Sequence, residues 1–207
     1  MNKNISHKIG FWSALTAMAL VFAYSLLQAL TDMNLIPGIK ESLWIFLPPL
    51  LVAPTFLLVV VSLHYSVGRE NKIWTSIALS LTTIYCGQII MLYIMQFAMP
   101  IEDLKLKYFF HYEGLFDKHD FLMAIDALTY FFIGISALFL AVALKGNMWI
   151  YRALLWISIL VPILLFAFVY PLFYFAGVIW IISFTMAMIE ISFFFKVSAK
   201  ANLNIVS

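Results

Sequence analysis

The sequence predicts an all-α fold: a polytopic transmembrane helical bundle of six spans, in a single membrane domain that covers residues 1–207. Two observations lead to this prediction. Hydrophobic residues make up 65% of the chain and charged residues only 11%, whereas soluble proteins are about 45–50% apolar and about 25% charged. The apolar residues also fall into long runs, each close to the roughly 20 residues that a helix needs to cross a bilayer.

The six runs lie near 9–31, 43–66, 73–98, 122–144, 150–170 and 173–195. The first is longer than the apolar part of a signal peptide, which is about 7–15 residues, so we expect an uncleaved helix. The last two runs are nearly continuous. Tyr170-Pro171 divides them, because proline disfavours helical geometry in the residue before it. An arrangement of four or five spans would require one run to be re-entrant.

The distribution of Lys and Arg predicts that both termini are cytoplasmic, since cytoplasmic loops carry an excess of these residues. With the N-terminus inside, eight lie on the cytoplasmic side: Lys3, Lys8, Arg69, Lys72, Lys145, Arg152, Lys196 and Lys200. Four lie on the outer side: Lys40, Lys105, Lys107 and Lys118. The longest connection, the outer loop 100–121, is therefore expected outside.

Asp126 is the first candidate for a functional residue, because a charge within lipid costs a few kcal/mol or more. It lies about five residues, or roughly 7 Å, into the fourth run from the outer side. Tyr130 follows four residues later and shares its helix face. One hypothesis is a proton or cation site that opens outward. The alternative is a carboxylate near a helix N-terminus, stabilised by the helix dipole and within reach of water.

Other polar residues have a depth similar to that of Asp126 and Tyr130. Gln28, Tyr93 and Gln96 lie toward the outer ends of the first and third runs. If these faces converge, they form an outward-facing pocket with aromatic walls and a few polar groups, which is typical of small-molecule sites. The alternative is a set of interhelical hydrogen bonds, each typically worth under about 1 kcal/mol.

His64 and Glu190 form a second candidate pair, near the inner ends of the second and sixth runs. They share a depth, and histidine titrates near neutrality, so the pair is a candidate proton relay. The alternative is that His64 is an interfacial residue and that Glu190 reaches toward the surface near Lys196.

No cofactor or metal site is predicted. One loop contains imidazole and carboxylate groups, which are suitable ligands for a divalent metal: His111, Glu113, Asp117, His119 and Asp120. The spacing of these residues matches no defined metal site, so we expect a solvated loop. The single cysteine, Cys86, excludes an intrachain disulfide framework. The net charge of +2 indicates no nucleic-acid partner.

The stretch EGLFDKHDFLMAIDALTYFFIGISALFLA resembles a segment of a family of small, uncharacterised bacterial polytopic membrane proteins. In that family an acid-Ala-Leu-x-Tyr-Phe run precedes a glycine, and the matching residues here are Asp126, Ala127, Leu128, Tyr130, Phe131 and Gly134. The PPLLVAPTF segment, 48–56, is similar as well. The resemblance covers about a third of the chain. It implies a location in the bacterial inner membrane and no assigned activity.

Three functions stay open on these observations. The leading hypothesis is small-molecule binding or transport through the polar pocket near Asp126. The second is a non-catalytic accessory or scaffold protein that binds another membrane protein or a further copy of itself, motivated by short loops and small residues four apart. The third is an intramembrane enzyme that acts on a lipid, supported only by the His64 and Glu190 pairing and by the outer loop with His111 and His119. The sequence contains no HExxH, GxSxG or P-loop motif, and this favours a non-enzymatic function.

Overall fold

The computed structural model describes residues 3–33, 35, 46–98, 118–167 and 173–203. Within these ranges the side chains of residues 3, 31–32, 95–98, 118–124, 159–167, 173–177 and 200–203 are outside the description. The described residues form six α-helices and one short 3-10 turn, so the all-α class is confirmed. The elements are α1 (Lys3–Asp32), α2 (Leu47–Ser66), η3 (Arg69–Asn71), α3 (Lys72–Ala98), α4 (Lys118–Ala143), α5 (Met148–Ala167) and α6 (Phe173–Leu203).

Five segments of these helices are long and apolar enough to cross a membrane: Asn4–Leu30, Leu47–Ser66, Arg69–Ile94, Ile125–Ala143 and Val178–Ala199. The remaining helix, α5, is 20 residues long, which equals the length of α2. The side chains of α5 are described only as far as residue 158. Many large apolar side chains point outward from the bundle, and Trp12 and Phe22 are 66% and 64% exposed. The chain is therefore a multi-pass membrane protein, in which lipid rather than water covers this surface.

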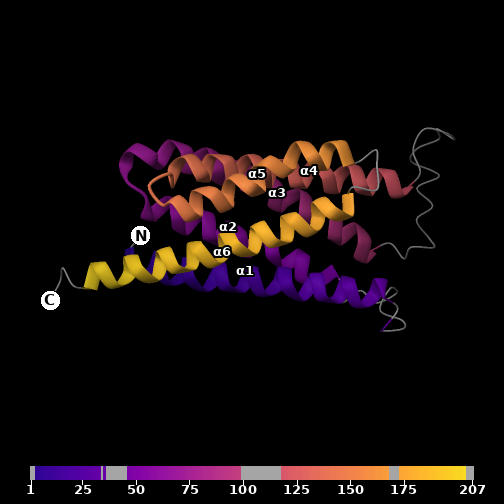
Figure 1. The fold of residues 1–207 in the computed structure, drawn as a ribbon, viewed down its shortest axis with the longest axis horizontal. Helices are drawn as coiled ribbons and strands as arrows, with labels where there is room; N and C mark the ends of the chain where they lie inside the picture. Colours follow the sequence, from indigo (N-terminus) through magenta and orange to yellow (C-terminus); the bar gives the residue numbers. More distant parts are fainter. Residues whose placement is uncertain (1–2, 34, 36–45, 99–117, 168–172, 204–207) are drawn as a thin grey trace.

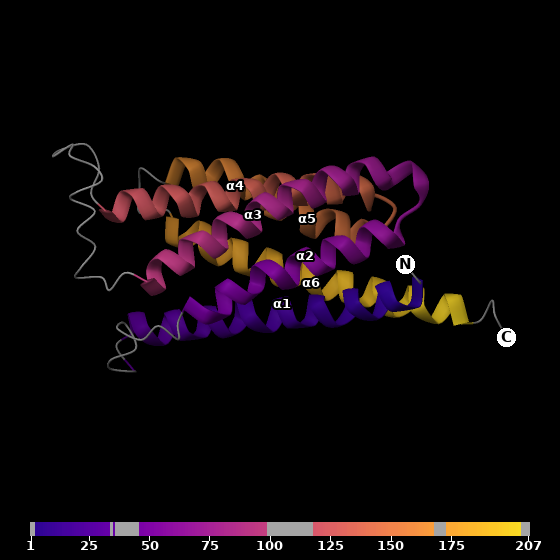
Figure 2. The same cartoon turned by 180° about the vertical axis from the view of Figure 1, so that it is seen from behind.

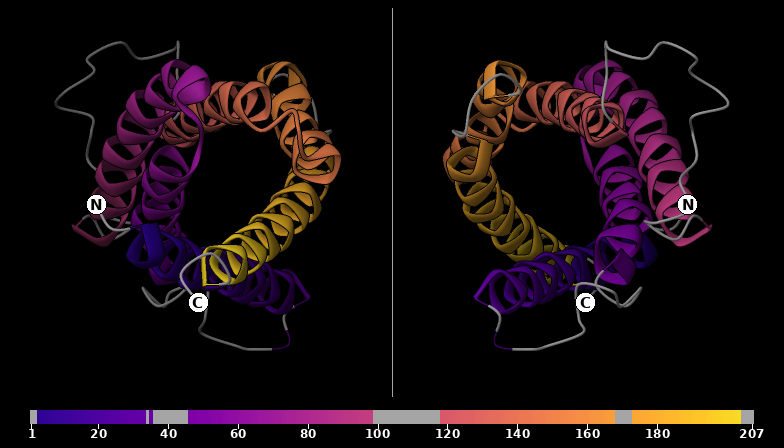
Figure 3. Two further views of the ribbon diagram at one scale, coloured as in Figure 1. Left: turned by 90° about the vertical axis from the view of Figure 1, so that its left-hand side faces the viewer. Right: turned by 90° about the vertical axis from the view of Figure 1, so that its right-hand side faces the viewer.

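The six helices form a closed ring in chain order. Each helix packs against the next one along the chain, and α6 packs against α1 to complete the ring (Figure 3). Successive helices run in opposite directions, and the two chain ends lie at the same end of the bundle (Figures 1 and 2). The α2–α3 and α4–α5 connections lie at that end too, and each is only four or five residues long.

The ends of the helices differ from the predicted runs where polar residues are adjacent. α1 begins at Lys3 and α6 ends at Leu203, so both extend past the apolar runs on the side of the termini. Lys8 and Lys196 are exposed near these ends, and the long side chain of a lysine allows its charged group to reach toward water from an apolar surface. α5 starts with a capping interaction, because the side-chain amide oxygen of Asn147 accepts hydrogen bonds from the backbone N–H groups of Trp149 and Ile150 at 3.2 and 3.4 Å.

Small residues and interhelical hydrogen bonds hold the ring together. At the α1–α6 contact, Gly10 lies directly against the ring of Phe195. Between α3 and α4, the hydroxyls of Thr82 and Ser136 are 2.7 Å apart, and Ser136 donates to the Ala78 carbonyl at 2.9 Å. Small residues allow helices to approach closely in a membrane, and such hydrogen bonds satisfy polar groups that lipid cannot.

Candidate functional site

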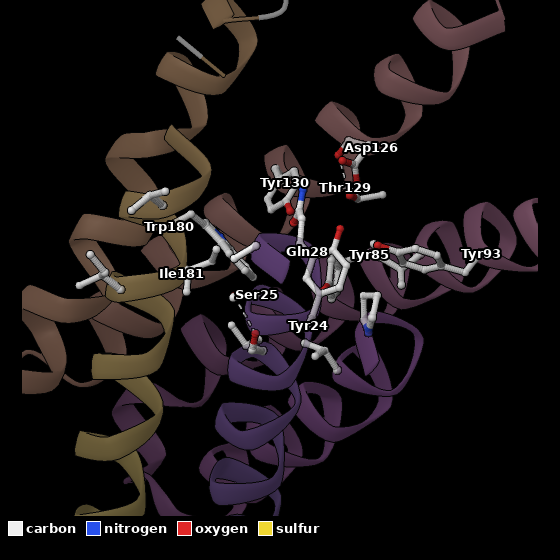
Figure 4. Close-up of a pocket in the computed structure, with 17 residues that line it drawn as sticks. Tyr24, Ser25, Gln28, Tyr85, Tyr93, Asp126, Thr129, Tyr130, Trp180 and Ile181 are labelled. Carbon is white, nitrogen blue, oxygen red and sulfur yellow. Dashed lines mark hydrogen bonds between the residues drawn. The ribbon is translucent and has the colours of Figure 1, made fainter. Parts of the chain in front are cut away.

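A cavity of about 470 Å³ lies within the half of the ring that is farther from the chain termini. Residues from five helices line it, namely the second half of α1, the start of α2, the second half of α3, the first half of α4 and the first half of α6. The polar and aromatic members of its wall are Tyr24, Ser25, Gln28, Tyr85, Tyr93, Asp126, Thr129, Tyr130 and Trp180 (Figure 4). Its volume falls within the range of about 300–1,000 Å³ that is usual for small-molecule sites.

Four of the five residues predicted for an outer pocket line this one cavity. Asp126 and Tyr130 come from α4, Gln28 comes from α1, and Tyr93 comes from α3. The fifth, Gln96, belongs to α3, but its side chain lies outside the described residues. The structure thus brings together residues that are far apart in the sequence. Their role in ligand binding stays a prediction.

Asp126 is partly accessible from the cavity rather than fully enclosed. Because α4 begins at Lys118, Asp126 lies about 12 Å along the helix axis from the start of the helix. The Thr129 hydroxyl, which is fully buried, donates to the backbone carbonyl of Asp126 at 2.6 Å. Asp126 is therefore an acid on a cavity wall, beyond the first turn in which a helix dipole acts strongly.

Aromatic rings form most of the remaining wall. Tyr85 and Tyr93 project from α3 and are only 4% and 7% exposed. Tyr130 meets Trp180 edge to face, with ring centroids 5.1 Å apart, and Trp180 stacks on Phe184 at 4.9 Å. These contacts fix the ring orientations, because aromatic pairs prefer such geometries. Trp180 lines the cavity with its indole ring. Its N–H is buried and has no hydrogen-bond partner among the described residues.

Sequence reasoning missed five of the polar and aromatic members of the wall, and four of them carried a usable signal. Tyr24 precedes Gln28 by four residues, Ser25 precedes Gln28 by three, Tyr85 precedes Tyr93 by eight, and Thr129 follows Asp126 by three. Residues at these spacings share a helix face, so each could have been found from its predicted neighbour. The fifth, Trp180, stands within an apolar run, and no spacing to a polar residue distinguishes it.

His64 and Glu190 have different neighbours. The Nδ1 atom of His64 is 2.9 Å from the hydroxyl of Thr75, so its described polar partner is on α3. Glu190 instead lines a groove between α5 and α6, together with Arg152 and two exposed tryptophans, Trp149 and Trp156. No described contact joins His64 to Glu190, and their function as a proton relay stays a prediction.

No group of three or more His, Cys, Asp or Glu side chains that could hold a metal occurs among the described side chains. The predicted solvated loop, with His111, Glu113 and Asp117, lies outside the described residues, as do the side chains of His119 and Asp120. Cys86 is a free, buried cysteine. Its thiol donates to the Ala53 carbonyl of α2 at 3.1 Å and thus helps to join α2 to α3.

The fold and the cavity define a class: a multi-pass helical membrane protein with a polar, aromatic cavity inside a ring of helices. Comparison of the chain with protein-family models, with curated proteins and with solved structures finds no match. The comparisons therefore identify no family, and the resemblance to small bacterial membrane proteins is supported only in its coarse part, a multi-helix protein with several candidate spans.

Proposed function

We propose that this chain is a small-molecule-binding or transport protein of the bacterial inner membrane, and that its ligand occupies the cavity around Asp126. The observation that carries the proposal is the convergence of polar and aromatic side chains from several helices on one cavity of about 470 Å³. Small-molecule sites generally combine an apolar or aromatic wall with a few polar groups that fix orientation.

The position of Asp126 adds a second argument. An ionisable residue within a membrane-spanning helix is costly and is normally retained for a function or for a pairing. Among the described residues that line the cavity, none is a lysine, arginine or histidine, so this wall offers Asp126 no cationic partner. Its side chain is partly accessible from the cavity, and a bound ligand or water can therefore satisfy it.

We further propose that the cavity belongs to the outer half of the membrane. By their order in the sequence, eight of the twelve Lys and Arg residues belong to the segments expected on the side of the chain termini and four to the segments expected on the other side, and cytoplasmic loops carry the excess of such residues. The cavity lies in the half away from the termini. A ligand would then enter from outside, in agreement with a transporter or a receptor for an external compound.

Native mass spectrometry of the gently purified full-length protein tests the proposal. We expect a discrete small-molecule adduct on the wild type, and a clear loss of that adduct in Asp126→Asn, because the substitution removes the charge with little change in shape. The matched control is Glu190→Gln, which alters an acid that does not line the cavity and should leave the adduct in place. Equal adducts in both variants, despite equal thermal stability, would contradict the assignment of the site.

A further inference from the structure

We infer that the ligand of this cavity is a small organic cation, with an amine or quaternary ammonium group placed between the Asp126 carboxylate and the surrounding aromatic rings. The inference rests on the proposed function, because it names the ligand class of the same cavity. Three features of the described wall carry it: the sign of its charge, the chemistry of its rings and the number of its metal-type ligands.

The first feature is the charge. Of the seventeen described residues that line the cavity, Asp126 is the only one with a charged side chain, and the others are aromatic, aliphatic, amide or hydroxyl residues. An anionic ligand would place a second negative charge beside this carboxylate in a poorly solvated space. A cation instead forms a pair with it, and pairing is the usual way in which a protein tolerates a charge away from water.

The second feature is the aromatic wall. Tyr24, Tyr85, Tyr93, Tyr130 and Trp180 come from four helices and surround the cavity (Figure 4). The tyrosine phenol groups line the same cavity as the Asp126 carboxylate, so the rings and the carboxylate face one space. The faces of aromatic rings carry negative partial charge, and cages of such rings are the common recognition site for quaternary ammonium groups.

The third feature favours an organic cation over a metal ion. Calcium and magnesium ions take about six to eight and about six oxygen ligands, respectively, and favour carboxylates. The described side chains hold no cluster of three or more His, Cys, Asp or Glu, and the described wall has a single carboxylate. An ammonium group with organic substituents needs fewer oxygen ligands, because the rings contact its carbon surface while Asp126 balances its charge.

The test compares each cation with an uncharged compound of the same shape. Choline is paired with 3,3-dimethyl-1-butanol, and benzyltrimethylammonium with neopentylbenzene, and all four are titrated into the purified full chain in mild detergent by calorimetry. We expect at least one cation to bind more tightly than its uncharged partner by about tenfold or more, the effect of a partly desolvated charge pair worth about 1.4 kcal/mol or more.

Three variants locate the effect in the cavity. Asp126→Asn should weaken cation binding about 30-fold or more, as expected when one partner of a buried charge pair is removed, and should leave the uncharged compounds unaffected. Tyr130→Phe keeps the ring and should retain the cation affinity within about twofold, whereas Tyr130→Leu removes the ring and should reduce it by about two- to fivefold. Glu190→Gln, outside this cavity, should behave as the wild type.

The outcomes separate this inference from the proposed function. If the uncharged compounds bind as well as the cations, and Asp126→Asn leaves that ratio unchanged, the cavity is a small-molecule site but the ligand class is wrong. If neither kind of compound binds, the cation inference fails, and the adduct found by native mass spectrometry decides on the proposed function independently. If Asp126→Asn does not fold, the wild-type ratio and the Tyr130 pair of variants decide the outcome.

Discussion

Gly10→Ala tests whether the closure of the ring between α1 and α6 limits the stability of the fold. A Cβ atom at residue 10 would meet three ring carbons of Phe195, the Cε1 atom at 2.7 Å and two others closer still. These contacts are well inside the normal separation of carbon atoms. Phe195 is itself fully buried and packs beside Phe194, with ring centroids 5.6 Å apart, so its ring has little room to move.

The expected cost follows from overpacking, which usually destabilises a core by about 1–3 kcal/mol. Replacing glycine by alanine within a helix also adds intrinsic helix stability of up to about 1 kcal/mol. Gly87→Ala controls for that gain, because Gly87 is likewise inside a helix and an added Cβ there meets nothing within 4 Å. The difference between the two variants therefore isolates the contact with Phe195, and we expect it to be about 1–3 kcal/mol.

The assay is reversible unfolding of the detergent-solubilised protein by SDS, followed by far-UV circular dichroism, for wild type and both variants. A double variant, Gly10→Ala with Phe195→Leu, completes the test, because a smaller side chain at 195 should recover part of the loss caused by the alanine. The reasoning is refuted if Gly10→Ala and Gly87→Ala are equally stable, or if the leucine substitution costs the same with glycine and with alanine at residue 10.

Two further predictions concern helix contacts and orientation. Thr82→Val removes the buried hydroxyl that forms a hydrogen bond to α4 and should lower the free energy of unfolding by about 0.6 kcal/mol in the same assay. The control is Thr83→Val, which removes an exposed hydroxyl bonded to its own helix and should lower that free energy measurably less. Equal losses of stability would mean that the interhelical hydrogen bond contributes nothing. In intact cells, a membrane-impermeant maleimide should label a cysteine at Met33, which is exposed directly after the end of α1. It should label a cysteine at Glu70, which is exposed in the connection between α2 and α3 at the opposite end of the bundle, only after permeabilisation. Buried Cys86 should stay unlabelled until the protein is unfolded, and the reverse pattern at the two introduced cysteines would invert the proposed orientation.

The sequence predicts how deep a residue lies in the bundle better than it predicts which way the residue faces. Depth follows from counting along an apolar run at about 1.5 Å per residue, and on this basis Gln28, Tyr93 and Asp126 were expected at one level. The structure places all three on one cavity. The same counting placed His64 and Glu190 at one level, yet their described neighbours differ.

The direction of a side chain is hard to predict here because lipid and the protein interior are both apolar. A soluble helix marks its buried face by an apolar stripe, but a membrane helix has no such contrast. Trp180 and Trp156 lie in similar apolar runs, and yet Trp180 is 7% exposed and Trp156 is 58% exposed. Trp180 differs from Trp156 because its ring contacts Tyr130 and Phe184 inside the bundle. No short-range pattern in the sequence reveals these contacts.

The closed ring also constrains the order of events during biosynthesis. Helices that are adjacent in the sequence can pair as soon as both have entered the bilayer, but α1 must wait for α6 to be synthesised before it meets its second neighbour. Both helices contribute walls to the cavity, through Tyr24 and Gln28 on one side and Trp180 on the other. The nascent chain can therefore assemble most of its helix pairs during insertion, while a complete cavity arises only at the end, when α6 joins α1.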